Sequence, residues 1–194
     1  AGEPAPPSKF VRPHAACVTT GGPVHIEACA DGEAGVAAEK ASIFEGLVPG
    51  GTAVANGDVA LSGVVCDRAR ALGARLVTFG TDMGHDARLL DFQPFEGGAR
   101  VRAELYGKPL DFELAQSGFH WGLNSLCVLL MLDALDVPLE TGLQALAGFR
   151  PLAGRGETIT VRAPGGAFTL IDESYNANPL SMAAGFRTLG ARPV

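Results

Sequence analysis

Short apolar runs alternate with helical patterns along the first 80 residues of the chain. The pattern predicts strands at Ala15–Thr19, Thr52–Ala55 and Arg75–Phe79, and helices at about Glu33–Leu47 and Val59–Leu72. Glycine and proline separate these segments, and Asp31 can cap the first helix. Strands and helices in alternation favour a parallel sheet flanked by helices, so the predicted fold class is α/β.

The pattern changes between residues 87 and 115. Three stretches show partial alternation of apolar and polar positions: Leu89–Phe95, Ala99–Tyr106 and Pro109–Leu114. Glycine-containing turns of the kind found in hairpins join them. We therefore expect a small antiparallel meander in addition to the mostly parallel sheet.

Helical spacing returns after the meander. The expected helix His120–Leu135 carries an apolar stripe at positions i, i+3, i+4, i+7, i+8 and i+11, formed by Leu123, Leu126, Cys127, Leu130, Met131 and Ala134. A second helix is expected at Pro138–Phe149, with its proline in the first turn. The last expected elements are a hairpin, Thr158–Val161 with Ala167–Asp172, and a helix at Leu180–Leu189.

Composition and charge narrow the function classes. The 194 residues suffice for one domain, or one domain and part of a neighbour. The net charge is −6 and no basic cluster is present, which argues against a nucleic-acid partner. The longest apolar run, Leu126–Leu132, is far shorter than a membrane span, and no leader-like segment opens the sequence. We expect a cytoplasmic monomer whose four cysteines, none in a CxxC pair, are reduced thiols and not zinc ligands.

Lys40 is the first candidate for chemistry. It shares one face of the expected helix Glu33–Leu47 with apolar positions only: Val36, Ile43, Phe44 and Leu47. Burying an ammonium group is costly, so lysine usually avoids such a stripe. The side chain either packs its stem and extends its amine to water, or the amine has a depressed pKa and is available for covalent modification.

Three further candidates lie in predicted loops. His25 follows a buried strand through a Gly-Pro loop, and ligand sites of open α/β sheets gather where strands end. The run Asp172–Pro179 places polar groups and a ring densely between a strand and a helix, and Arg155 lies between two glycines where it could hold an anion. A lone loop histidine or an exposed arginine is also common without a function.

Phosphate-loop motifs are missing from the sequence. No GxxxxGK[ST] pattern occurs, and the nearest Gly-Lys pair, Gly107-Lys108, lies in an expected hairpin turn before Pro109. A GxGxxG pattern after a strand is also absent. The residue pattern alone therefore indicates an α/β domain with a polar cluster and leaves its reaction open.

Taken together, the segments resemble the Mur ligases, and within that family the branch that adds D-alanyl-D-alanine to UDP-N-acetylmuramoyl-tripeptide. The matching segments are Ala1–Glu3, Val11–Pro13, Ala15–Glu27, Gly35–Lys40 with Ile43 and Phe44, Gly118–Ser125, Arg155 and Asp172–Pro179. Asp172–Pro179 is the most specific of these, because it is very close to the Asp-Asp-Ser-Tyr-Asn-Ala-Asn-Pro stretch typical of that branch. The resemblance spans nearly the whole chain.

The resemblance implies ligation driven by ATP and Mg²⁺. Such ligases activate a substrate carboxylate as an acyl phosphate, which an incoming amine then attacks. Lys40 would become a carbamate and, with His25, take part in catalysis and hold a metal ion, since Mg²⁺ prefers oxygen ligands. The positions implied for binding the nucleotide are His120, Asn124, Arg155, Glu173, Asn176 and Asn178.

The sequence departs from the family pattern at several positions. Trp121 replaces an asparagine used near adenine, so Asn124 or the indole face would take over that contact. Glu173 stands where aspartate is more usual, and Thr20 and Gly21 replace Asn and Ile.

The resemblance also implies a domain layout. Residues 1–174 would be a central ATPase domain without its phosphate loop, with residues 87–115 as an antiparallel subsheet. Residues 175–194 would be a linker and the first helix of a C-terminal domain, and the phosphate loop would lie upstream of Ala1. We expect the chain by itself to be inactive. The alternatives are another Mur ligase, a folylpolyglutamate-type ligase, or a non-catalytic scaffold domain of the same fold.

Overall fold

The computed structural model describes residues 7–20, 32–95, 97–150, 154, 156–175, 177 and 179–190. The elements of its first half are α1 Ser8–Val11, β1 Ala15–Val18, α2 Gly32–Ala41, the 3₁₀ helix η2 Ser42–Gly46, β2 Thr52–Asn56, α3 Ser62–Ala71 and β3 Arg75–Gly80. Then follow β4 Ala87–Phe95, β5 Gly98–Leu105, β6 Lys108–Leu114, α4 Phe119–Asp133, α5 Leu139–Gly148, β7 Glu157–Ala163, β8 Gly166–Asp172 and α6 Pro179–Gly190.

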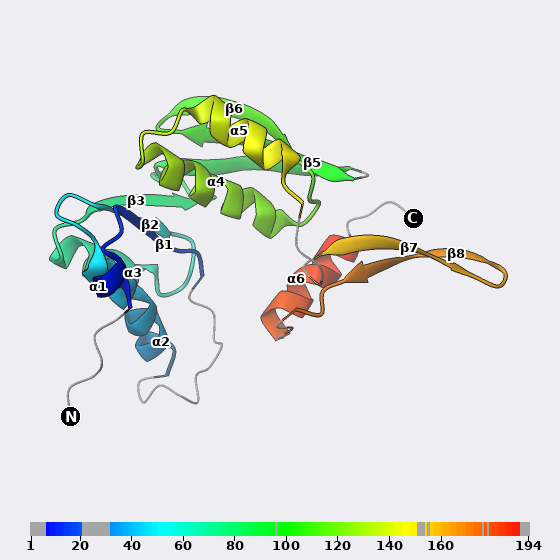
Figure 1. Ribbon diagram of the computed structural model, residues 1–194, viewed down its shortest axis with the longest axis horizontal. Helices are drawn as coiled ribbons and strands as arrows, with labels where there is room; N and C mark the ends of the chain where they lie inside the picture. The colour runs from blue at the N-terminus through cyan, green and yellow to red at the C-terminus, as the bar shows by residue number, and fades with distance from the viewer. Residues whose placement is uncertain are drawn as a thin grey trace.

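Strands β1 to β6 form one sheet in the order of the sequence (Figure 1). The pairs β1–β2, β2–β3 and β3–β4 are parallel, and the pairs β4–β5 and β5–β6 are antiparallel. The expected meander is therefore present, and it continues the parallel sheet because β4 pairs with the end of β3 through Phe79↔Ala87 and Gly80↔Arg88. The predicted α/β class, a mostly parallel sheet flanked by helices, is confirmed.

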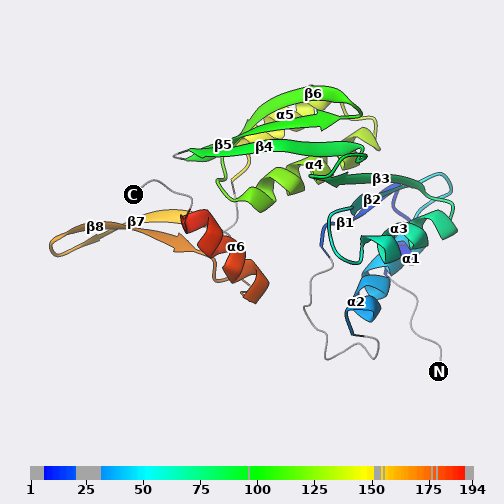
Figure 2. The same ribbon diagram turned by 180° about the vertical axis from the view of Figure 1, so that it is seen from behind.

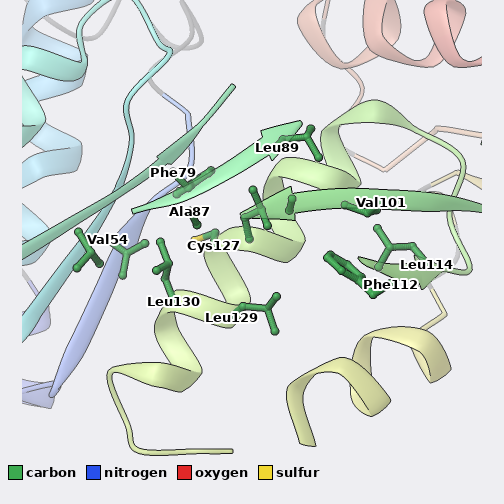
Figure 3. Packing of buried hydrophobic residues seen from close by; sticks show 13 residues of the cluster. Val54, Phe79, Ala87, Leu89, Val101, Phe112, Leu114, Cys127, Leu129 and Leu130 are labelled. Carbon is green, nitrogen blue, oxygen red and sulfur yellow. The ribbon is translucent and has the colours of Figure 1, made fainter. Parts of the chain in front are cut away.

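Helices cover both faces of the sheet. On one face α4 packs against β1–β5 in a buried cluster that includes Val54, Phe79 and Leu130 (Figure 3). On the other face α2 and α3 pack against alternate residues of β1, β2 and β3, such as Ala16, Ala53 and Ala55. This two-sided burial explains why the strands read as continuous apolar runs: all five residues of β2 are buried.

Two predicted helix boundaries were wrong. The helix expected at Glu33–Leu47 ends at Ala41 and continues as the 3₁₀ helix η2. The tighter turn brings Gly46 against α1, where an added Cβ would lie 2.2 Å from the carbonyl carbon of Ser8. The helix expected from Val59 begins at Ser62, because the chain first makes a turn in which Asn56 accepts a hydrogen bond from the amide of Asp58.

The hairpin β7–β8 forms a separate two-stranded antiparallel sheet, followed by α6. In both views the hairpin lies to the side of the six-stranded sheet (Figures 1 and 2). Helix α6 contacts α4. None of the helices within the described ranges is long and apolar enough to cross a membrane.

Candidate ligand site at the carboxyl edge of the sheet

Helix α4 runs opposite to the parallel strands. Its last residue, Asp133, accepts a hydrogen bond of 2.8 Å from the hydroxyl of Tyr106. The backbone amide of Tyr106 donates a hydrogen bond to the carbonyl oxygen of Asp86, just before β4. The first residue of α4, Phe119, packs edge-on against Phe92 farther along β4, with ring centroids 5.7 Å apart. The first turns of α4 thus lie on the side where the parallel strands end, which is where ligand sites of open α/β sheets occur.

Lys40, at the end of α2, reaches the same edge. Its half-buried side chain donates a hydrogen bond of 2.9 Å from Nζ to the carbonyl oxygen of Thr20, just beyond β1. The neighbouring carbonyl, that of Thr19, accepts a hydrogen bond of 3.0 Å from Nδ2 of Asn56 at the end of β2. The lysine of the apolar stripe therefore holds a backbone carbonyl at the edge of the sheet, and does not simply extend into water.

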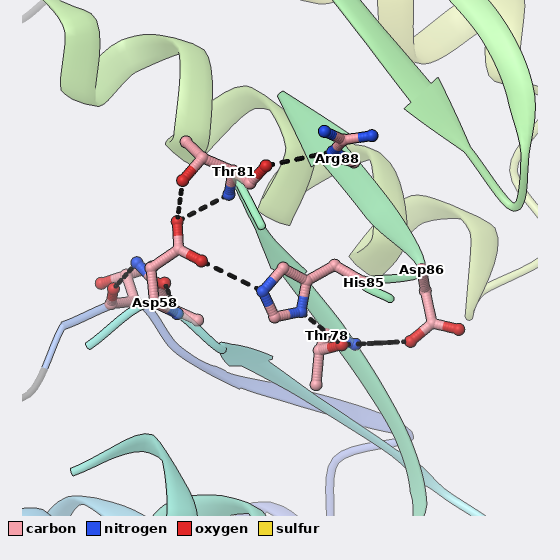
Figure 4. A network of polar contacts seen from close by, with 8 residues as sticks. Asp58, Thr78, Thr81, His85, Asp86 and Arg88 are labelled. Atoms are coloured by element: carbon pink, nitrogen blue, oxygen red, sulfur yellow. Dashed lines mark hydrogen bonds and ion pairs between the residues drawn. The ribbon is translucent and has the colours of Figure 1, made fainter. Parts of the chain in front are cut away.

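A polar network links the ends of β2 and β3 (Figure 4). The carboxylate of Asp58 accepts hydrogen bonds from the amide and hydroxyl of Thr81, at 2.6 and 2.8 Å, and lies 3.0 Å from Nε2 of His85. Nδ1 of His85 lies 3.1 Å from the hydroxyl of Thr78, whose amide donates to Asp86. These contacts join two consecutive strand ends into one rigid polar edge.

The environment of Asp58 sets its protonation. Burial opposes its ionisation, but the hydrogen bonds from Thr81 and His85 outweigh that effect and hold the pKa of Asp58 below its usual value. The carboxylate is consequently ionised near neutral pH, as the hydrogen-bond pattern requires.

This network was not predicted from the sequence. Its signal was present: Asn56 and Asp58 directly follow one buried strand, and Thr81, His85 and Asp86 follow the next. Polar residues after consecutive strands of a parallel sheet meet at its carboxyl edge.

The first turns of α4 carry His120 and Asn124, both half-buried. Burial lowers the pKa of His120, which favours its neutral ring near pH 7. Trp121 packs its indole against Phe149 beyond α5, with ring centroids 5.6 Å apart. The indole thus packs within the protein, whereas the side-chain amide of Asn124 makes no hydrogen bond to any described residue.

The run Asp172–Pro179 connects β8 to α6. Asp172 accepts a hydrogen bond of 3.0 Å from the amide of Ser174, and bonds from the hydroxyl and amide of that residue lower its pKa. Glu173 lies beside α6: a Cβ added at Gly185 would be 3.4 Å from its Cγ. Burial, and then the charge of Asp172, raise the pKa of Glu173.

A comparison with known protein families identifies the family of this chain. The profile of the Mur ligase middle domain matches residues 2–132 of the chain. The chain belongs to the Mur ligase family. The family expected from the sequence motifs is thereby confirmed.

Curated relatives of this Mur ligase domain include UDP-N-acetylmuramate–L-alanine ligases. The chain is 32% identical over 188 residues to the UDP-N-acetylmuramate–L-alanine ligase of Saccharopolyspora erythraea, covering 94% of the chain and 36% of that relative. It is 34% identical over 142 residues to the ligase of the same name from Salinispora arenicola, covering 73% of the chain and 27% of that relative. The chain therefore spans about a third of the length of the curated relatives it matches.

Solved structures similar to this Mur ligase domain include a different member. A crystal structure of MurF from Acinetobacter baumannii superposes with a TM-score of 0.85 at 25% identity, covering 96% of the chain and 39% of the MurF chain. The apo form of L. casei FPGS superposes with a TM-score of 0.75 at 18% identity, covering 96% of the chain and 45% of the FPGS chain, which shows a shared fold alone.

The expected site residues divide into three groups in this Mur ligase domain. His25, Arg155, Asn176 and Asn178 lie outside the described residues. Lys40, His120 and Asn124 lie on the carboxyl-edge side of the sheet. Glu173 lies against α6, and no hydrogen bond or ion pair within the described ranges joins it to Lys40 or to α4.

A metal site is incomplete among the described residues. They contain no group of three or more His, Cys, Asp or Glu side chains that could hold a metal ion. The side chain of Lys40 ends in an amine that donates a hydrogen bond to Thr20, and an unmodified amine supplies no oxygen to bind Mg²⁺. The described side chains alone therefore do not make up a magnesium site.

Proposed function

We propose that the protein to which this chain belongs is a cytoplasmic, ATP-dependent amide ligase that adds D-alanyl-D-alanine to UDP-N-acetylmuramoyl-tripeptide. The observation that carries this proposal is the run Asp172–Pro179, which closely resembles the stretch typical of that branch of the family. Family membership supports the ligase class. The likeness to the Acinetobacter baumannii MurF structure is consistent with the branch.

The proposed reaction has two steps. A carboxylate oxygen of the tripeptide attacks the γ-phosphorus of ATP, and the bond from that phosphorus to the bridging oxygen breaks. ADP departs, and the tripeptide carries an acyl phosphate. The amine of D-alanyl-D-alanine then attacks the acyl carbonyl, loses a proton and expels inorganic phosphate, which forms the amide. Holding the two substrates in line with the nucleotide is the principal task of the protein in such a reaction.

Lys40 and His25 form the proposed metal side of this site. Addition of carbon dioxide to the amine of Lys40 would replace a cation with a carbamate, which offers the oxygen ligands that Mg²⁺ prefers. The half-buried position of the amine at the carboxyl edge supports this role. Mg²⁺ would neutralise phosphate charge there.

The proposed nucleotide side lies at the start of α4. We assign His120 and Asn124 to the adenine, on the basis of their position in the first turns of that helix. Arg155 is assigned to the terminal phosphate, and Glu173, Asn176 and Asn178 to the remaining contacts with the nucleotide, on the resemblance of their segments.

The domain layout is part of the same proposal. Residues 1–174 would be the central domain, and residues 175–194 a linker with α6 as the first helix of a following domain. The separate β7–β8 sheet and the position of α6 after the Asp172–Pro179 run are compatible with a boundary in this region.

Addition of L-alanine to UDP-N-acetylmuramate is the second candidate function. It is favoured by the 32% identity to the Saccharopolyspora erythraea ligase over 94% of the chain. The Asp172–Pro179 run favours D-alanyl-D-alanine, because it is typical of that branch and not of its sister ligases. The remaining alternatives are a folylpolyglutamate-type ligase and a non-catalytic scaffold role.

A paired ligation assay tests these functions. The protein encoded with this chain is incubated with ATP, Mg²⁺ and either UDP-N-acetylmuramoyl-tripeptide with D-alanyl-D-alanine or UDP-N-acetylmuramate with L-alanine, and the products are identified by mass. We expect product and ADP from the first pair only, and none when ATP is omitted. Product from the second pair only would contradict the D-alanyl-D-alanine assignment, and product from neither pair would contradict both assignments and favour a folylpolyglutamate-type ligase or the scaffold role.

A further inference from the structure

Two consecutive carbonyl groups at the end of β1 are each held by a side chain from another element. The carbonyl of Thr19 accepts a hydrogen bond of 3.0 Å from Asn56, and the carbonyl of Thr20 accepts one of 2.9 Å from Lys40. Because the two carbonyls belong to adjacent residues, fixing the first limits where the second can lie. The location of the Lys40 amine is thus coupled to Asn56.

Asn56 is itself rigidly placed. It is only 8% exposed, and as the last residue of β2 it pairs with Phe79 of β3. Its Nδ2 donates to Thr19, and its Oδ1 accepts a hydrogen bond of 3.0 Å from the amide of Asp58. A side-chain amide can donate and accept at once, which a carboxylate or an apolar side chain of that size cannot do.

Asp58, whose amide donates to Asn56, is held in turn by residues at the end of β3. The carboxylate of Asp58 accepts hydrogen bonds from the amide and hydroxyl of Thr81 and lies 3.0 Å from His85. Gly57, between Asn56 and Asp58, leaves room for the His85 ring, since a Cβ added at Gly57 would lie 2.0 Å from Cε1 of that ring. One series of polar contacts therefore runs from the end of β3, through Asn56, to the acceptor of Lys40.

We propose that Asn56 is a positioning residue for Lys40: it fixes the end of β1 so that the Thr20 carbonyl presents an acceptor to the Lys40 amine. The use of that amine in ligation rests on the proposed function, whereas the restraint on it does not. Asn56 acts through the backbone of Thr19 and Thr20, without contacting substrate.

Competitive labelling of amines tests the proposal directly. The sequence holds three lysines, Lys9, Lys40 and Lys108, so acetic anhydride labelling followed by peptide mass analysis resolves each one. Lys108 is exposed and serves as the internal reference. We expect Asn56→Ser to raise the labelling rate of Lys40 relative to Lys108 by about 5-fold, the scale of one lost hydrogen bond. A serine hydroxyl can still accept from the Asp58 amide but is too short to reach Thr19.

Gln116 provides a matched control. It is also a buried side-chain amide, 6% exposed, and its Nε2 donates a hydrogen bond of 2.7 Å to the carbonyl of Phe149, away from Lys40. Gln116→Ser should lower the unfolding temperature as Asn56→Ser does, yet leave the Lys40 to Lys108 ratio as in the wild type. If Asn56→Ser unfolds the chain, Asn56→Thr, which introduces a β-branched residue that favours a strand and carries a hydroxyl, takes its place with the same expected ratio.

Two results would overturn the proposal. An unchanged Lys40 to Lys108 ratio in a folded Asn56 variant would show that Asn56 does not restrain the amine. An equal rise in the Asn56 and Gln116 variants would show a general loosening of the structure. Labelling uses neither nucleotide nor substrate, so its outcome does not depend on whether the ligation assay yields product.

Discussion

Gly57 and Gly80 bring two strand ends close around the ring of His85. An added Cβ would lie 2.0 Å from the ring at Gly57, and 2.3 Å from Oδ1 of Asp58 at Gly80. The side chains of His85 and Asp58 are only 14% and 21% exposed, so neither can move freely into solvent. At the scale of single residues, small backbone positions thus make room for a charged group that would be costly to bury without partners.

Asp58 should make stability depend on pH. Its folded pKa lies below its usual value, so its stabilisation is fully present above the unfolded pKa of about 3.9 and is lost as the pH falls through the folded pKa. We expect Asp58→Asn to lower the free energy of unfolding by about 1–3 kcal/mol at pH 7, and by progressively less below about pH 4. Urea unfolding at a series of pH values measures both quantities.

Asp67 is the matched control for that prediction. Its carboxylate is 77% exposed and pairs with Arg70 in the next turn of α3. Asp67→Asn should change the free energy of unfolding by less than about 0.5 kcal/mol. A loss for Asp58→Asn that is no larger than this, or that grows on acidification, would contradict the role given to Asp58.

Helix α4 is the element that joins the core to the candidate site. Its apolar stripe could be predicted from helical spacing, and Leu126, Cys127 and Leu130 are buried as expected. Leu129 is buried as well although it lies outside the stripe, because α5 covers the side of α4 that a single-sided pattern leaves to solvent. The same packing fixes the first turns of α4, and with them His120 and Asn124.

Leu130→Ala tests how strongly α4 is anchored. Leu130 is fully buried, so its truncation should lower the free energy of unfolding by about 2–5 kcal/mol through lost burial and an added cavity. Val128 is 42% exposed on the same helix, and Val128→Ala should change the free energy of unfolding by about 0.5 kcal/mol or less. Equal losses in the two variants would contradict the packing described for α4. Thermal or urea unfolding measures both.

For the whole molecule, the alternation of strands and helices was enough to predict the α/β class and the order of the main strands and helices, though not the short helices α1 and η2. It could not show that β4 continues the parallel sheet, because only two residue pairs join β3 to β4. Lys40 could be singled out as a charge within an apolar stripe. Asn56, Asp58 and His85 were not singled out, although each follows a predicted strand, because a polar residue after one strand is ordinary and only the meeting of separate strand ends in the fold joins the three into a network.

Under the proposed function, the carboxyl edge of this sheet, with Lys40 at its margin, forms part of the site of an amide ligase. The ligation rates of the Lys40→Ala and Lys108→Ala variants, measured in the whole protein to which this chain belongs, test this role. Loss of a carbamate that holds a metal ion should lower the rate of Lys40→Ala by about 100-fold, and a short carboxylate such as acetate should restore part of it by supplying the missing oxygen ligands. Lys108→Ala should keep the wild-type rate, because Lys108 is exposed in the β5–β6 hairpin. A Lys40→Ala variant as active as Lys108→Ala would contradict the account.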